Sequence, residues 1–252
     1  MLLKAYKDFD DLFITLNKNV IENPQEYVEF ENWNQFYLPF SIFEVNSCDC
    51  KIDLGLLGYT KNKMEMLINT YIDFEKFDNF KKHLRICKGT SLTLYFKNIK
   101  PKQGTTGNNG PCIISMVFTK KYRNDKYFSE VNIFYRTTEV NRRFYADLCL
   151  FYLIMKEMPS DLVNIEKYRI IIPKPFFHTK TILFNLNIFN ANLEIDNNVT
   201  KQIKNHLIKF NSDKEISYKS HDRIRRKLIG ELKYDKVILD DLYITDGGLH
   251  LL

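Results

Sequence analysis

The fold of this chain is constrained most by two neighbouring strand patterns that are followed by a long apolar run. Residues 113–119 and 130–135 have the composition of strands, and the charged, turn-prone residues 120–128 between them predict a hairpin. Residues 147–158 are strongly apolar, are long enough for a buried helix, and are followed by Pro159. These segments therefore predict a strand hairpin and a buried helix within one folded unit.

Helical spacing of apolar residues occurs towards both ends of the chain. It covers residues 6–21, residues 63–84 with a break near Asp73, and residues 199–210. Strand patterns are found at residues 36–45, 91–96, 168–172 and 181–195, and again from Val237. Residues 101–110 are rich in glycine and small polar residues and predict a loop. The order of elements predicts an α+β fold with a mixed or antiparallel sheet, in a single domain over residues 1–252.

Composition narrows the class of protein. The chain has 252 residues, of which 44% are hydrophobic, and this favours a globular domain over a disordered one. Its net charge of +6 is modest, and the basic run at residues 223–227 is typical of a solvated helix face, which argues against a nucleic-acid ligand. Five irregularly spaced cysteines, and no apolar run of membrane length, predict a soluble cytoplasmic protein with reduced thiols and no membrane partner.

The predicted hairpin carries a thiol at its head, Cys112, and a guanidinium at its far end, Arg136. A thiolate is a strong nucleophile near neutral pH, and a nearby arginine lowers the pKa of a thiol and binds anions. The pair suggests a covalent enzyme that acts on a phosphorylated compound. Alternatively, Cys112 is a small buried hydrophobe and Arg136 forms a surface ion pair with Glu130 or Glu139.

The stretch from Pro111 to Leu148 resembles the thymidylate synthase family, which includes the deoxycytidylate hydroxymethylases of bacteriophages. That family has Pro-Cys, a hairpin, Arg-Ser-x-Asp, and an Asn eight residues beyond the Asp. Here the order is Pro111-Cys112, the predicted hairpin, Arg136-Thr137-Thr138-Glu139, and Asp147 eight residues beyond Glu139. Ser41-Ile42-Phe43 and Met64-Glu65-Met66-Leu67 resemble two further family segments upstream.

The resemblance implies a thymidylate synthase-like mixed sheet flanked by helices, assembled as a homodimer. It implies transfer of a one-carbon unit from 5,10-methylenetetrahydrofolate to C5 of a pyrimidine nucleotide. Cys112 would add to C6 of the ring, and Glu65 would relay protons through water to the group at C4. Glu65 is otherwise an exposed helix glutamate.

The resemblance also implies how the nucleotide is held. Arg136 would bind the phosphate, for which its permanent charge and forked shape are suited, and Thr137 would donate its hydroxyl to the same phosphate. Glu139 takes the place of the family's Asp, one methylene longer. His178 falls near the segment that holds the sugar hydroxyl, although it is equally typical of a loop histidine with its own partners.

Asp147 departs from the Asn of thymidylate synthases. A carboxylate accepts a hydrogen bond from the exocyclic amine of cytosine, whereas it cannot donate one unless it is protonated. The cytidylate hydroxymethylases of the family carry Asp here, so the resemblance favours dCMP over dUMP and hydroxymethylation over methylation. Alternatively, Asp147 caps the helix that follows it.

Some family features have no counterpart in this chain. Residues 30–38 contain no arginine for the phosphate, and Trp33 is the only tryptophan, whereas thymidylate synthases flank the folate with tryptophans. Two other functions therefore stay open. One is a non-catalytic nucleotide-binding protein of the same fold, and the other is a cysteine hydrolase that pairs Cys112 with His178.

Overall fold

The computed structural model describes residues 5–24, 26–30, 33–86, 91–97, 112–123, 126–159, 164–179, 186–189, 191–212, 236–245 and 248–251. Its helices are α1 (Phe9–Glu22), α2 (Lys61–Tyr71), α3 (Phe74–Ile86), α4 (Arg143–Lys156), α5 (Leu186–Phe189) and α6 (Asn198–Ser212). No helix in these ranges is long and apolar enough to cross a membrane.

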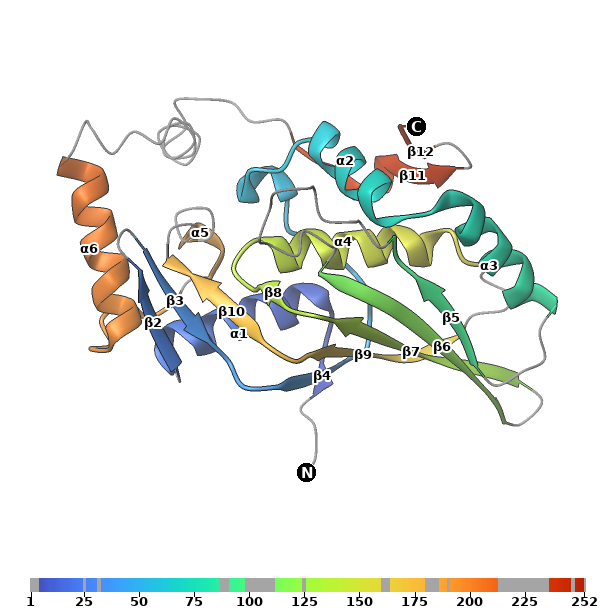
Figure 1. Ribbon diagram of the computed structural model, residues 1–252, viewed down its shortest axis with the longest axis horizontal. Coiled ribbons are helices and arrows are strands. Elements are labelled where there is room, and N and C mark those ends of the chain that lie inside the picture. The colour runs from blue at the N-terminus through green and yellow to red at the C-terminus, as the bar shows by residue number, and fades with distance from the viewer. Residues whose placement is uncertain are drawn as a thin grey trace, which may run out of the picture.

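A mixed six-stranded sheet forms the body of the molecule (Figure 1). Its order is β1 (Ala5–Tyr6), β4 (Ser41–Val45), β9 (Ile165–Ile172), β7 (Lys126–Tyr135), β6 (Ile113–Arg123) and β5 (Ser91–Tyr95). The pairs β1–β4 and β7–β9 are parallel, and the other neighbours are antiparallel. The predicted α+β domain with a mixed sheet flanked by helices is thus confirmed.

The helices α1, α3 and α4 cover one face of this sheet. Ring contacts from the sheet reach each of them: Tyr168 to Phe9 of α1, Phe118 to Phe80 of α3, and Tyr135 to Phe151 of α4. Strand side chains alternate between faces, and the buried apolar residues of β7 and β9 occupy alternate positions that point to this side. Figure 1 shows α4 running across the strands between the sheet and α2.

Helix α4 is the centre of the core. It spans 14 residues and is buried around nearly its whole circumference, which requires partners on every side. Phe13 of α1 packs against Tyr145 with ring centroids 4.8 Å apart. The hydroxyl of Tyr145 donates to Asp10 at 2.6 Å and accepts from the amide of Ile52 at 3.0 Å. These contacts hold the N-terminal half of α4 in one orientation.

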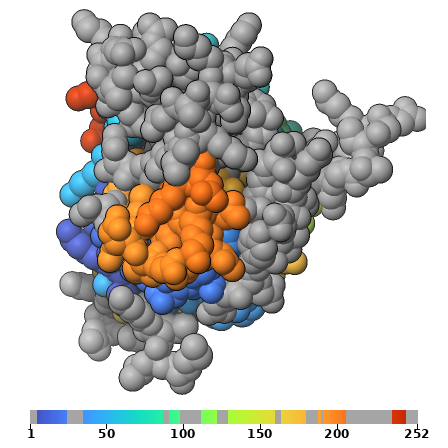
Figure 2. All heavy atoms as spheres, turned by 90° about the vertical axis from the view of Figure 1, so that its left-hand side faces the viewer, coloured from blue at the N-terminus to red at the C-terminus, as the bar shows by residue number. Residues whose placement is uncertain are grey.

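A second sheet extends the molecule beside β4 and β9. Its order is β2 (Glu26–Phe30), β3 (Trp33–Tyr37), β10 (Pro175–His178) and β8 (Thr138–Glu139), with β10 and β8 parallel. Helix α6 packs against α1 at this end. Figure 2 shows α6 in orange on the surface there, next to blue residues from the N-terminal part of the chain.

A third sheet is the hairpin of β11 (Leu242–Thr245) and β12 (Gly248–Leu251).

Helix ends follow local capping chemistry. The side chain of Asp8 accepts from the amide of Asp11 at 2.8 Å and begins α1. Thr60 does the same for α2 through the amide of Lys63. Asp73 accepts from the amide of Lys76 at 3.3 Å, which starts α3 immediately after α2 ends. The predicted break near Asp73 is therefore confirmed, because two separate helices meet there.

Three predicted segments need correction. Residues 120–128 were expected to be a connection, but β6 continues to Arg123 and β7 begins at Lys126, because cross-strand pairing extends the hairpin. Residues 181–195 were expected to be strand, whereas their described part contains the short helix α5 and turns. The buried helix predicted at residues 147–158 begins four residues earlier, at Arg143. The predicted loop at residues 101–110 lies outside the described residues.

The sheet face that points away from the helices carries a chain of ion pairs. Arg169 of β9 bonds to Glu44 of β4 at 2.7 Å and to Glu130 of β7 at 2.9 Å. Glu130 also pairs with Lys121 of β6 at 2.6 Å. The chain links four adjacent strands and uses Arg169 as a cation shared between two carboxylates.

Replacing Phe151 by alanine tests whether α4 is the centre of the core. Phe151 is 0% exposed, and its ring centroid lies 6.0 Å from that of Tyr135 and 6.1 Å from that of Phe96. The cavity left behind should lower the free energy of unfolding by about 3–5 kcal/mol, measured by urea denaturation. Ile86→Ala on α3, where Ile86 is 74% exposed, is the control and should cost less than about 1 kcal/mol. Equal losses in the two variants would contradict this assignment.

Candidate functional site around Cys112

The β6–β7 hairpin brings Cys112 and Arg136 together. Ile113 pairs with Tyr135, so the residues just outside this pair meet at the open end of the hairpin. The amide of Arg136 donates to the carbonyl of Cys112 at 2.7 Å. Cys112 is only 9% exposed, and Pro111 before it lies outside the described residues. The expected neighbourhood of thiol and arginine therefore arises directly from strand register.

Tyr71, the last residue of α2, connects two parts of this site. Its hydroxyl accepts from the backbone amide of Cys112 at 3.5 Å and from the guanidinium of Arg143 at 3.1 Å. In the sequence, Tyr71 fits the apolar face of a helix, and Arg143 falls in the unassigned connection before the apolar run. Neither position carried a sequence signal for the site.

Asp147 lies one helical turn after Arg143 on α4. Its side chain is 0% exposed, and neither carboxyl oxygen has a hydrogen-bond partner among the residues that the structure describes. Burial raises the pKa of Asp147 to about 8, and the positive charge of Arg143 partly opposes this shift. Because α4 begins at Arg143, Asp147 sits inside the helix, and the capping role considered from the sequence is excluded.

The thiol of Cys112 experiences opposing charges. Burial raises the pKa of Cys112, and the negative charge of Asp147 raises it further. Arg143 and Arg136 lower the pKa of Cys112, whereas Glu139 raises it. The effects that raise the pKa prevail, with burial the largest, so the thiol of the free protein is protonated near neutral pH. Formation of a thiolate at this position would require a change in its surroundings.

Two further tyrosines surround the same group of charges. Tyr135 at the end of β7 is 1% exposed, and its hydroxyl has no hydrogen-bond partner in the described ranges. Burial raises the pKa of Tyr59, and Arg142, Asp147, Glu139 and Arg143 are the charges that act on it. The guanidinium of Arg142 lies 5.9 Å from the ring centroid of Tyr59. Aromatic and cationic groups thus border the buried carboxylate.

The predicted nucleotide-binding residues lie on the short strands next to this group. Glu139 of β8 is half-buried and is close enough to act on the pKa of Cys112. The hydroxyl of Thr137 donates to the carbonyl of Lys174 at 2.5 Å, so its proton is engaged within the protein. His178 ends β10, where its amide donates to Asn141 at 3.2 Å and its carbonyl accepts from the Asn141 side chain at 3.0 Å.

Glu65 occupies a different side of α2 from Tyr71. The buried residues of α2 are Met64, Ile68 and Tyr71, whereas Glu65 is exposed. Asp147, Arg143, Arg136 and Glu139 are the charges that act most on Cys112, and neither Glu65 nor His178 is among them. The structure therefore groups Cys112 with Arg136, Glu139 and Asp147 of the predicted set.

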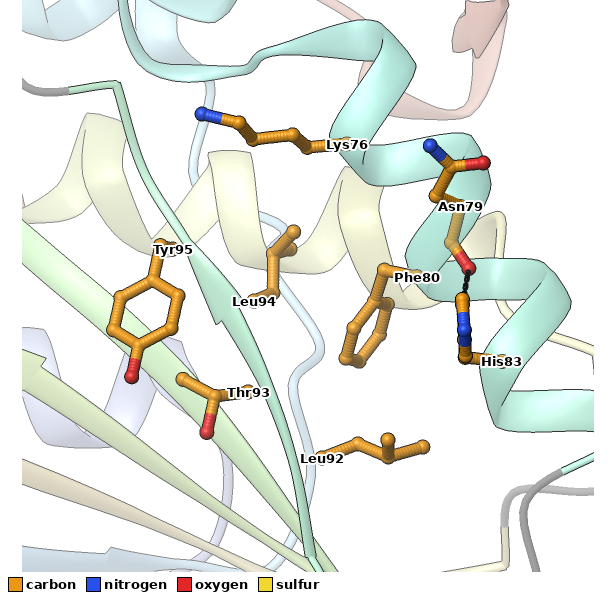
Figure 3. Close-up of a pocket in the computed structure, with 8 residues that line it drawn as sticks. All are labelled: Lys76, Asn79, Phe80, His83, Leu92, Thr93, Leu94 and Tyr95. Carbon is orange, nitrogen blue, oxygen red and sulfur yellow. Dashed lines mark hydrogen bonds between the residues drawn. The ribbon is translucent and has the colours of Figure 1, made fainter.

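A surface pocket elsewhere on the molecule is separate from this site. Figure 3 shows it between α3 and the edge strand β5, with Lys76, Asn79 and His83 on one side and Leu92–Tyr95 on the other. Its volume is about 270 Å³, and none of its lining residues belongs to the group around Cys112. No group of three His, Cys, Asp or Glu side chains within the described ranges could hold a metal ion.

The comparisons with known proteins give a likeness to solved structures alone. No protein-family model matches the chain, and no curated protein matches it. Among solved structures, the thermostable thymidylate synthase A from Bacillus subtilis is similar with a TM-score of 0.41 at 8% sequence identity. The likeness covers 72% of this chain and 84% of that chain. At this level it carries no argument about chemistry, which has to come from the residues themselves.

Asp147→Asn tests the burial of the carboxylate by its effect on stability. The pKa of Asp147 is about 8 in the folded protein and ordinary in the unfolded chain, so the folded state binds the proton more tightly. Stability should therefore fall as pH rises from about 4 to about 8. The variant lacks this loss, and near pH 8.5 it should be more stable than the wild type by up to about 5 kcal/mol.

Urea unfolding of both proteins near pH 4.5 and near pH 8.5 measures the difference. The gain should be small at the lower pH, where the wild-type carboxyl group is neutral in the folded state. A gain that is the same at both pH values would contradict the raised pKa.

Proposed function

We propose that this protein transfers a one-carbon unit from 5,10-methylenetetrahydrofolate to C5 of a pyrimidine deoxynucleotide, with dCMP as the substrate and hydroxymethylation as the outcome. The observation that carries the proposal is the buried Asp147 carboxyl group, which has no hydrogen-bond partner within the described part of the chain and acts on the nucleophile candidate Cys112. A buried polar group without a partner is rare in a folded protein and is explained when a ligand supplies the partner.

Asp147 is suited to recognising a cytosine ring by hydrogen bonds. As a carboxylate it accepts from the exocyclic amine of cytosine, and as a neutral acid it can also donate to the ring nitrogen beside that amine. With its pKa raised to about 8, the neutral form dominates near neutral pH. Methylated or hydroxymethylated uracil nucleotides remain the alternative products, because a neutral acid can also pair with the N3–H and O4 of uracil.

Cys112 is the proposed nucleophile. Its sulfur adds to C6 of the pyrimidine and forms an S–C6 bond, while the π electrons of the C5–C6 bond shift towards C4 and leave C5 able to attack an electrophile. The thiol proton has to leave before this step. A base that accepts a hydrogen bond from the neutral form of Asp147 would keep this group uncharged beside the thiol, which favours that loss.

The phosphate and sugar are assigned to the residues on the adjoining strands. Arg136 is half-buried next to Cys112 and is the proposed phosphate anchor, with Thr137 and Glu139 beside it. His178 is the proposed contact of the sugar hydroxyl. Glu65 is the proposed proton relay, and its exposed position means that water or a bound ligand has to connect it to the ring.

Tyr59 and Arg142 fit a folate. An aromatic face can stack against the pterin, and the guanidinium 5.9 Å from the Tyr59 ring centroid can pair with the folate carboxylates. Bound 5,10-methylenetetrahydrofolate supplies the one-carbon unit in electrophilic form. The tyrosine takes the place of the tryptophans that the family uses to flank the folate.

A non-catalytic nucleotide-binding role is the second candidate, and the state of Cys112 favours it. Burial raises the pKa of this thiol above its ordinary value in the free protein, whereas a permanently activated nucleophile would have a lowered one. Under this alternative, dCMP binds equally well to the wild type and to Cys112→Ser, and no chemistry follows.

Release of tritium from [5-³H]dCMP in the presence of 5,10-methylenetetrahydrofolate tests the proposed reaction, because the hydrogen at C5 leaves when the new bond forms. We expect release with the wild type and a loss of at least about 1,000-fold in Cys112→Ser, because serine is a far weaker nucleophile. Cys48→Ser, the same exchange at a half-buried cysteine, is the control and should retain release within about twofold. Folded protein that releases no tritium from dCMP or dUMP would rule out the reaction.

The outer sheet face supports a homodimer. Ile42, Ile171 and Phe134 lie side by side on β4, β9 and β7, opposite the helices, and are half-buried in the single chain. The ion-pair chain through Arg169 runs along the same face. A second copy related by a two-fold axis can cover this apolar row and place the alternating charges of the two copies opposite each other.

Light scattering coupled to size exclusion tests this assembly. We expect the wild type to have twice the 30.1 kDa mass of one chain at about micromolar concentration, and Phe134→Glu to have the mass of one chain because it buries a charge at the interface. Ile86→Glu places the same charge on the exposed side of α3 and should stay dimeric. A wild type with the mass of one chain would contradict the proposal.

A further inference from the structure

We propose that Arg143, anchored by Tyr71, is the positioning residue that permits ionisation of the Cys112 thiol, and that Cys112 and Asp147 share it as their counter-cation. The inference deepens the proposed function and rests on Cys112 being its nucleophile. It assigns to Arg143 the activating role that the sequence alone assigned to Arg136.

The geometry joins Arg143 to the backbone of Cys112 through the hydroxyl of Tyr71. The guanidinium donates to the hydroxyl of Tyr71 at 3.1 Å, and the same oxygen accepts from the backbone amide of Cys112 at 3.5 Å. Tyr71 is 0% exposed, so this oxygen is fixed by the packing of α2. The side chain of Arg143 is otherwise exposed, and the bond to Tyr71 holds its charge at the buried site.

Arg143 also lies one helical turn before Asp147, on the same side of α4. The guanidinium charge therefore acts on two acidic groups and favours the ionised form of each. One cation cannot fully compensate two neighbouring anions in a buried place. Ionisation of Asp147 and ionisation of Cys112 should therefore compete, because the negative charge of either group disfavours ionisation of the other.

The other charges around the thiol do not replace Arg143. The groups that face Cys112 come from four places: Tyr71 on α2, Tyr135 at the end of β7, Arg136 and Glu139 around β8, and Arg143 and Asp147 on α4. Arg143 has a larger effect on Cys112 than Arg136 has, and Glu139 opposes Arg136 locally.

The rate of alkylation of Cys112 by iodoacetamide, followed by mass spectrometry of its peptide from about pH 6.5 to pH 10.5, tests the inference on the free protein. The thiolate attacks the methylene carbon and iodide leaves, so the rate reports the ionised fraction. Arg143→Gln should move the midpoint of the profile up by about one pH unit and slow the reaction about tenfold near pH 8. Asp147→Asn should move the midpoint down and speed the reaction.

Several variants separate electrostatics from folding. Arg143→Lys keeps the charge and should restore most of the rate, whereas Tyr71→Phe removes the anchor and should slow the reaction about threefold or more near pH 8. Arg136→Gln should slow it less than Arg143→Gln does. Arg85→Gln removes the same charge from the exposed end of α3 and should leave the rate within about 1.5-fold.

A folded Arg143→Gln with the wild-type profile, or an Arg136→Gln with the larger effect, would overturn the inference. If Arg143→Gln does not fold, two other results would overturn the inference. One is a Tyr71→Phe variant that reacts at the wild-type rate, and the other is an Arg143→Lys variant that reacts at about a tenth of the wild-type rate. The measurement needs neither nucleotide nor folate. If only the proposed function fails, no tritium is released but the alkylation rates of the variants follow the expected order. If this inference fails, the alkylation rates themselves depart from that order.

Discussion

The antiparallel pairing of β6 with β7 is the constraint on which the rest of the structure depends. Its register sets Ile113 opposite Tyr135. At the open end of the hairpin, the amide of Arg136 donates to the carbonyl of Cys112 at 2.7 Å. The same strands lie between β9 and β5 in the sheet and form part of the face against which α4 packs. A change of one residue in this register would turn the buried side chains outwards and separate the thiol from α4.

Helix α4 serves both the core and the site, and these roles conflict at Asp147. The helix is buried around nearly its whole circumference, which stabilises the domain but leaves no water for a polar side chain. A carboxyl group without a partner lowers stability at pH values where it is ionised, because the folded state favours its neutral form. Such a loss is typical of a binding site, where a ligand restores the missing hydrogen bonds.

The electrostatics of the site depend on the sharing of one cation. Arg143 is bonded to Tyr71 and stands near both Cys112 and Asp147, so the two acidic groups depend on the same charge. The free protein keeps the thiol protonated, which protects a reactive group from unproductive oxidation or alkylation.

Local patterns in the sequence determined the hairpin, the long helices, the break at Asp73 and the positions of Cys112 and Arg136 at the two ends of one hairpin. These features depend on side-chain periodicity and capping, which act over a few residues. Only the tertiary structure brought Tyr71 and Arg143 to the thiol, because they come from two helices far apart in the chain. It also decided that Asp147 lies inside a helix without a partner, since burial depends on the packing of every surrounding element. The sequence by itself therefore placed the reactive group, and the packing of distant helices decided which charges control it.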